Sequence, residues 1–216
     1  QLIVWNPEDD EIVGGYRFLC GENMMRDETG RPQSPTAALF EISDRFIDDF
    51  LPVTFELGRS FVQPHYQPAY DLRKGFYSLD NLWDGLGELI KRHPSIEYFF
   101  GKITMYPRFN ITARDMILYF LDRFFPDNDN LLTPKDDIRI DIVTDPVEFD
   151  TLFVGKDYGE NYRILQKNVR RLKEQVPPLV AAYMNLSKTM RSFGTARNHN
   201  FGGVENGDHS WRILAE

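Results

Sequence analysis

The sequence contains a single cysteine, Cys20, among its 216 residues. One cysteine excludes an intrachain disulfide and the paired spacing of a zinc ribbon, and it fits a reducing compartment. No apolar run approaches the roughly 20 residues that span a bilayer, and the first residues lack the pattern of a signal peptide. We therefore expect a cytoplasmic protein.

Basic residues are in deficit. The chain carries 25 Lys and Arg against 33 Asp and Glu, which gives a formal net charge of −8. Nucleic-acid binding depends on neutralising phosphates, so we expect no nucleic-acid partner. Hydrophobic residues at 42% and charged residues at 27% are ordinary for one globular domain, whereas the aromatic content of 14% is high.

Common catalytic signatures are missing as well. The sequence has no Gly-x-Ser-x-Gly elbow, no Walker loop, no dinucleotide-binding glycine pattern and no His-Glu-x-x-His. Its four histidines are scattered along the chain, at His65, His93, His199 and His209. We therefore expect no metal site.

Hydrophobic periodicity predicts an α/β fold in one domain over residues 1–216. Expected strands cover 2–5, 12–19, 53–62, 96–105, 138–143, 190–198 and 210–214. Expected helices lie around 44–49, from Ser78 to before Pro94, from Thr112 to before Pro126, over 162–172 and over 179–184. We interpret Ser78 as an N-cap and Thr112 with Asp115 as a capping pair. This order predicts a mixed sheet with helices on its faces.

Two stretches have the residue types of a functional site. Glu56 and Arg59 lie in a strand, and a bulge at Gly58 would bring them to one face, where they form either a strand salt bridge or a ligand site. Arg73, Lys74 and Gly75 directly precede the expected N-cap Ser78, and a basic loop at a helix N-terminus suits a phosphate group. A solvated loop is the alternative for the second stretch.

The run ELGRSFV from Glu56 to Val62, followed by Pro64 and Tyr66, resembles a motif of bacterial acyltransferases in the GNAT superfamily. These are the ornithine- and glycine-lipid N-acyltransferases, often labelled hemolysin-like. Further similar stretches are LDNLWDGL from Leu79, YFFGKI from Tyr98, VPPLV from Val176 and FGT from Phe193. The run VGGYR from Val13 to Arg17 also resembles the related acyl-homoserine-lactone synthases.

The resemblance implies a GNAT-like, mostly antiparallel mixed sheet with splayed central parallel strands, flanked by helices. It also implies a family-specific helical insertion over residues 127–190, and a domain that lacks its first strand and helices, because the chain opens inside a strand at Leu2.

The resemblance also implies an acyl thioester as co-substrate, with no tightly bound cofactor. The usual GNAT pattern Arg/Gln-x-x-Gly-x-Gly/Ala is absent, and the loop 67–77 has only Gly75. This departure favours acyl carrier protein, with one pantetheine phosphate, over acyl-coenzyme A. The positions Gln63, His65 and Gln67 differ from the ornithine-lipid enzymes, which puts the acceptor in question.

The implied reaction transfers a 3-hydroxy fatty acyl group to the amine of glycine or ornithine. Glu56 is the expected base, and Arg59 and Arg17 are the expected groups for orienting it or binding the acceptor carboxylate. The backbone N–H of Phe61 or Val62 would stabilise the oxyanion. Arg73, Lys74, Gly75 and Ser78 would hold the phosphate.

Two alternatives remain open from the sequence, a homoserine-lactone-type signal synthase and a non-catalytic module that binds acyl carriers or lipids. The product of the implied N-acyltransferase reaction is a lipid, so we expect peripheral contact with the inner membrane. The basic segment from Arg163 to Lys173 could supply that contact or receive the acidic carrier protein, and a solvated helix face is the favoured alternative.

Overall fold

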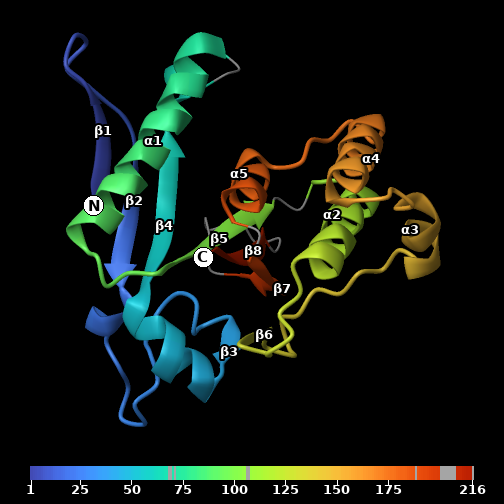
Figure 1. The fold of residues 1–216 in the computed structure, drawn as a ribbon, viewed down its shortest axis with the longest axis horizontal. Helices are drawn as coiled ribbons and strands as arrows, with labels where there is room; N and C mark the ends of the chain where they lie inside the picture. Colours follow the sequence, from blue (N-terminus) through green and yellow to red (C-terminus); the bar gives the residue numbers. More distant parts are fainter. Residues whose placement is uncertain (68–69, 71, 106–107, 188, 200–207, 216) are drawn as a thin grey trace. The chain divides into compact units, whose positions relative to one another are not determined.

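The computed structural model describes residues 1–67, 70, 72–105, 108–187, 189–199 and 208–215. The chain forms two compact units, each assembled from two segments. The first contains Gln1–Met25 and Asp48–Gly101, and the second contains Arg26–Ile47 and Lys102–Glu216. Figure 1 traces their elements along the chain.

The first unit is a mixed sheet with a helix on one face. Its strands are β1 (Leu2–Asn6), β2 (Glu11–Cys20), β4 (Thr54–Val62) and the first part of β5 (Tyr98–Met105), and they are neighbours in that order. β1, β2 and β4 are antiparallel, as the expected hairpin predicts, whereas β4 and β5 are parallel. Helix α1 (Leu72–Arg92) makes the crossover that parallel strands require. The described residues of the unit also include the short 3-10 helices η1 (Gly21–Asn23), η3 (Leu51–Val53) and η4 (Pro64–Tyr66).

The core of this unit lies between α1 and the sheet. Leu82, Leu86 and Leu89 recur at helical spacing on α1 and pack against Phe55 and Leu57 of β4. Because strand side chains alternate, these contacts identify the face of the sheet that α1 covers. Leu2, Val4, Phe18 and Val62 pack at the edge of the same cluster.

The start of α1 differs from the sequence prediction. The helix begins at Leu72, so Arg73, Lys74 and Gly75 lie in its first turn and not in a preceding loop. Ser78 is 3% exposed inside the helix and is no N-cap. Leu, Arg and Lys favour helix, and Gly75 opposes it by only about 1 kcal/mol, so the helix extends through the segment.

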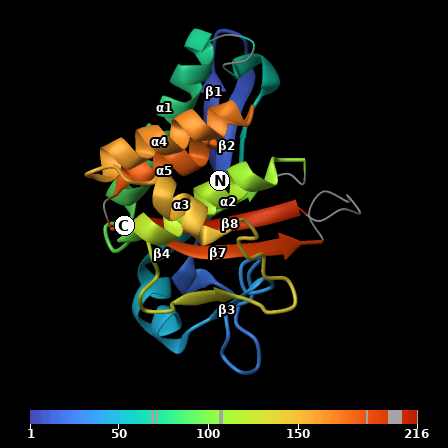
Figure 2. The same cartoon turned by 90° about the vertical axis from the view of Figure 1, so that its right-hand side faces the viewer.

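The second unit combines helices with short strands. Strand β3 (Phe40–Ile42) pairs with β6 (Leu132–Pro134), and β7 (Arg191–Asn198) pairs with β8 (Asp208–Ala215). In strand order β8 lies between β7 and β5, which ends in this unit. The helices are α2 (Ile111–Phe124), α3 (Pro146–Leu152), α4 (Tyr158–Arg171) and α5 (Pro178–Leu186), and in Figure 2 they lie above β7 and β8 with β3 below. The helix expected around 44–49 ends in the π-helical turn η2 (Phe46–Phe50).

Asp115 has a different role from the predicted one. Asn110 caps α2 by accepting from the Ala113 N–H, so the Thr112–Asp115 capping pair is wrong. Asp115 is fully buried and accepts from Arg114 and from the backbone of Val143 and Thr144.

The predicted strand over 138–143 is also absent from the described residues of that segment. Ile140 donates to Thr195 and Arg197 donates to Ile138, which leaves a single bridge, Arg139 to Ala196. Since Asp115 takes the amides of Val143 and Thr144, the segment cannot continue a ladder there.

Candidate active site

The candidate site is built on β4, whose parallel pairing with β5 is short. The register runs from Thr54 with Tyr98 to Leu57 with Gly101, and β4 then continues to Val62 along β2. A strand that keeps one neighbour over its second half presents backbone groups at its other edge. The predicted residues Glu56, Arg59, Phe61 and Val62 all lie on this strand.

A bulge interrupts β4, one residue later than predicted. Gly15 pairs with Phe61 and Arg17 pairs with Gly58, so Arg59 and Ser60 together stand opposite Tyr16. Arg59 itself has a φ of 54°, a left-handed conformation that disfavours side chains. Arg59 is exposed at this bend. Tyr16 is buried, and burial raises the pKa of its hydroxyl to about 12.

Glu56 and Arg17 share the face of the sheet that α1 does not cover. Phe55 and Leu57 point toward α1, so Glu56 between them points away. Leu19 pairs with Glu56 and Arg17 pairs with Gly58, which places both on that same face. Glu56 is only 9% exposed, whereas Arg17 is exposed.

The two expected oxyanion donors face different edges of β4. Gln63 donates to the carbonyl of Val13, so Val62 and Gly14 form a non-hydrogen-bonded pair. The N–H and C=O of Val62 therefore point away from β2. Its carbonyl accepts a 2.8 Å hydrogen bond from the side chain of Gln67. Phe61, one residue earlier, turns its N–H toward Gly15, so the geometry favours Val62 as the donor.

The proposed phosphate-binding residues shift with the helix start. The backbone of Arg73, Lys74 and Gly75 lies in the first turn of α1, where amide N–H groups point outward. The side chains of Arg73 and Lys74 lie outside the described residues. Ser78 is buried beyond that turn and does not contribute its amide to the helix end.

The segment after β4 is held to the β1–β2 hairpin by contacts that the sequence did not predict. The buried Tyr66 hydroxyl accepts from Asn6 at 2.9 Å and donates to Asp9 at 3.1 Å. His65 pairs with Glu11 at 2.9 Å. These side chains therefore position the chain between β4 and α1. In the sequence, only the polar residues of the segment 6–11 indicated that such contacts could form.

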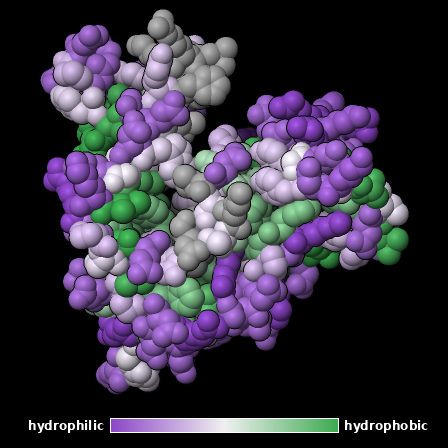
Figure 3. All heavy atoms as spheres, in the orientation of Figure 1, coloured by the Kyte–Doolittle hydropathy of each residue, from purple (hydrophilic) through white to green (hydrophobic). Residues whose placement is uncertain are grey.

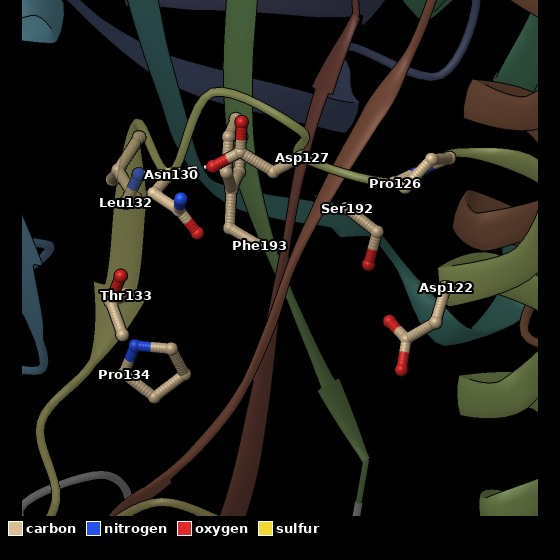
Figure 4. Close-up of a pocket in the computed structure, with 9 residues that line it drawn as sticks. All are labelled: Asp122, Pro126, Asp127, Asn130, Leu132, Thr133, Pro134, Ser192 and Phe193. Atoms are coloured by element: carbon tan, nitrogen blue, oxygen red, sulfur yellow. Dashed lines mark hydrogen bonds between the residues drawn. The ribbon is translucent and has the colours of Figure 1, made fainter.

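A separate pocket of about 250 Å³ lies in the second unit (Figure 4). Its walls come from the end of α2, the following loop, β6 and β7, namely Asp122, Pro126, Asp127, Asn130, Leu132, Thr133, Pro134, Ser192 and Phe193. Burial raises the pKa of Asp122 to about 6. Asp127 shapes the pocket by accepting from the Leu131 N–H at 2.6 Å. No sequence-predicted site residue lines this pocket.

Within the described part of the chain, no three His, Cys, Asp or Glu residues are grouped so that they could hold a metal ion. Among the described residues, no helix has both the length and the apolar character to cross a membrane.

Comparison with known proteins adds to this geometry. The model of the acetyltransferase (GNAT) domain family matches residues 1–73, which include β1, β2 and β4. The chain is 51% identical over 205 residues to a glycine N(alpha)-acyltransferase of Phocaeicola vulgatus, covering 95% of the chain and 62% of that protein. A glycine N(alpha)-acyltransferase of Bacteroides thetaiotaomicron gives the same 51% identity over 205 residues, with 95% and 60% covered.

The chain thus spans 62% and 60% of the length of these two curated relatives. No solved structure matches it. The matched domain, the parallel β4–β5 pair joined through α1 and the high identity to both relatives agree with one another. Residues 1–73 therefore match the acetyltransferase (GNAT) domain family, and the chain is similar over 95% of its length to two N-acyltransferases.

Proposed function

We propose that this chain carries the acyl-transfer site of an enzyme that joins a fatty acyl group to the amine of glycine. The observation that carries the proposal is the 51% identity, over 95% of the chain, to two proteins named glycine N(alpha)-acyltransferase. Their names favour glycine over ornithine as the acceptor. The donor is an acyl thioester, used as a co-substrate with no tightly bound cofactor.

The chemistry requires a deprotonated amine and a stabilised oxyanion. Glu56 accepts the proton of the glycine ammonium, directly or through water, and the amine then attacks the thioester carbonyl. The C–N bond forms, the C–S bond breaks and the thiol leaves with a proton. The Val62 N–H, which points away from β2, supports the negative oxygen of the tetrahedral intermediate. Arg17 and Arg59 are the candidates for binding the glycine carboxylate.

The donor is proposed to be a 3-hydroxy fatty acyl group on acyl carrier protein. Its single pantetheine phosphate suits the first-turn amides of α1 at Arg73, Lys74 and Gly75. Acyl-coenzyme A, which carries more phosphate, is the competing donor. A homoserine-lactone-type synthase would require S-adenosylmethionine. A requirement for this compound in the assay would therefore distinguish signal synthesis from acyl transfer to glycine.

Peripheral membrane contact is proposed because the product is a lipid. Arg163, Lys167 and Arg170 are exposed on α4, opposite the buried Leu165 and Val169, and Figure 3 shows hydrophilic side chains over this helix. A basic face on an acidic chain suits anionic headgroups or the acidic carrier protein.

The test is an acyl-transfer assay with 3-hydroxyacyl carrier protein and acyl-coenzyme A, each with glycine or ornithine, followed by mass spectrometry of the products. We expect N-acylglycine from the carrier-protein donor. Glu56→Gln should lower kcat by about 100-fold or more, because the amine loses its base. The exposed Glu41→Gln in the second unit is the matched control. Binding of the acylated carrier without loss of the thioester would refute catalysis by this chain.

A further inference from the structure

The face of the first unit's sheet that α1 does not cover has an apolar strip. We define the apolar strip as Ile3, Trp5, Ile12 and Phe61, whose exposed fractions are 52%, 49%, 39% and 48%. Leu2, Val4 and Val62 pack toward α1, so their neighbours Ile3, Trp5 and Phe61 point to the opposite face. Four large apolar side chains are therefore left in solvent on one side of three strands.

The strand registers place the strip in two rows. Ile3 pairs with Gly15, and Gly15 pairs in turn with Phe61, so these three form one row across the sheet. Trp5 pairs with Ile12 in the next row, after a register shift between Val4 and Trp5. Gly15 has no side chain between its neighbours, and a Cβ there would lie 3.4 Å from the Phe61 ring. The ring thus extends over the glycine toward β1.

The strip has a different charge at each end. Arg17 lies two residues from Gly15 on the same strand and face, beside the buried carboxylate of Glu56. The other end leads into the β1–β2 turn, which carries Glu8, Asp9 and Asp10. A single amphiphile with a carboxylate near Arg17 and an apolar chain over the strip would match both the cation and the apolar surface of this face.

We propose that the apolar strip binds the fatty acyl chain, with the carboxylate of the acylated amino acid at Arg17. The inference rests on the proposed function, since an N-acylglycine has a carboxylate close to one end of a long apolar chain. Exposed contiguous apolar patches on a folded unit are typical of binding surfaces. The strip then determines which acyl chain lengths the enzyme uses.

The test uses an N-acylglycine with bromine at the end of its acyl chain, because bromine quenches nearby tryptophan fluorescence. We expect quenching that is lost in Trp5→Phe, which separates Trp5 from Trp83 and Trp211. Phe61→Ser should weaken binding of this probe by about tenfold or more, as removal of a buried aromatic contact predicts. Val154→Ser, at an apolar residue of the second unit that is 73% exposed, should leave binding unchanged.

The head group is tested separately. Arg17→Gln should weaken binding of the N-acylglycine but not of the matched N-acylethanolamine, which lacks the carboxylate. Unchanged probe binding in Phe61→Ser would overturn the proposal. So would a Phe61→Ser effect confined to self-association in sedimentation velocity, because the occupant would then be a second copy of the chain.

Two outcomes separate this inference from the proposed function. If acyl transfer continues and Phe61→Ser leaves its chain-length preference unchanged, binding of the acyl chain by the apolar strip is refuted and the proposed function stands. If no donor supports transfer but the probe still quenches Trp5, the binding strip stands and the transfer function is refuted.

Discussion

Glu56 and Arg17 are diagonal neighbours on one face of the first unit's sheet, because Leu19 pairs with Glu56 and Gly58 pairs with Arg17. Diagonal neighbours in an antiparallel pair are roughly 7–8 Å apart, within reach of a long side chain. Glycine has its amine and carboxylate on a single carbon. One glycine could therefore meet both side chains at once, which connects the buried carboxylate to the exposed cation.

Arg17→Gln should raise the KM for glycine by about tenfold or more, since a charged hydrogen bond contributes about 1.5–3 kcal/mol. The kcat should change much less, because Glu56 and the Val62 N–H are untouched. Initial rates against glycine concentration measure this, with Arg92→Gln at the exposed end of α1 as the control. A fall in kcat at constant KM would contradict the assignment.

Arg59→Gly should be more stable than Arg59→Ala by about 1 kcal/mol, because only glycine adopts a positive φ without strain. Arg59 has a φ of 54° at the bulge opposite Tyr16. Urea unfolding of the two variants gives the comparison, and both lose the same guanidinium. Equal stabilities would mean that the bulge relaxes when the side chain is removed.

Asp115→Ala should destabilise the protein by about 3–5 kcal/mol, since it leaves the buried Arg114 guanidinium without its carboxylate. It also removes the acceptor of the Val143 and Thr144 amides. Thermal and urea unfolding measure the loss. Asp141→Ala, whose side chain is 80% exposed, should cost little. Similar effects for both variants would show that the buried pair contributes no more than a surface carboxylate.

Asp122→Asn should stabilise the protein at pH 8 and have little effect at roughly pH 4. Burial raises the pKa of Asp122 from 3.8 to about 6, so the folded state favours the protonated form and loses stability as pH rises through 6. The gain at pH 8 should be about 1 kcal/mol, because solvent still reaches the side chain.

Asp129→Asn is the control, because its expected effect on stability at neutral pH is opposite to that of Asp122→Asn. Hydrogen bonds from Arg191 and Arg45 lower the pKa of Asp129, so its contribution to stability is present above pH 3.8 and is lost as pH falls below it. The Asn variant should therefore be less stable than the parent at neutral pH. If both variants shift stability in the same direction, the environment assigned to Asp122 is wrong.

The sequence predicted the elements with strong periodicity. The hairpin β1–β2, the body of α1, the strands β4 and β5 and the pair β7–β8 are all confirmed. Their apolar residues repeat at intervals of two or near three and a half, which local geometry dictates. The start of α1 was wrong because Ser78 has the side chain of an N-cap, while packing keeps it inside the helix.

Other differences depended on contacts between distant residues. Asp115 looked like a local capping residue, but it accepts from Val143 and Thr144 and so prevents the predicted strand there. The bulge lies at Arg59 and not at the conformationally more permissive Gly58. The reason is that the pairing register with β2 decides which residue of β4 is the extra one in the bulge.

By itself, the sequence determined the α/β class, the acidic charge, the order of the main strands and helices and the likeness to N-acyltransferases. Those properties follow from composition, periodicity and motifs, which are read along the chain. Only the tertiary structure decided that Glu56 and Arg17 share a face, that Val62 and not Phe61 turns its N–H outward, and that four apolar side chains meet on the open sheet. The physical reason is that strand register, set by pairing between distant segments, assigns every side chain and amide to a face or an edge.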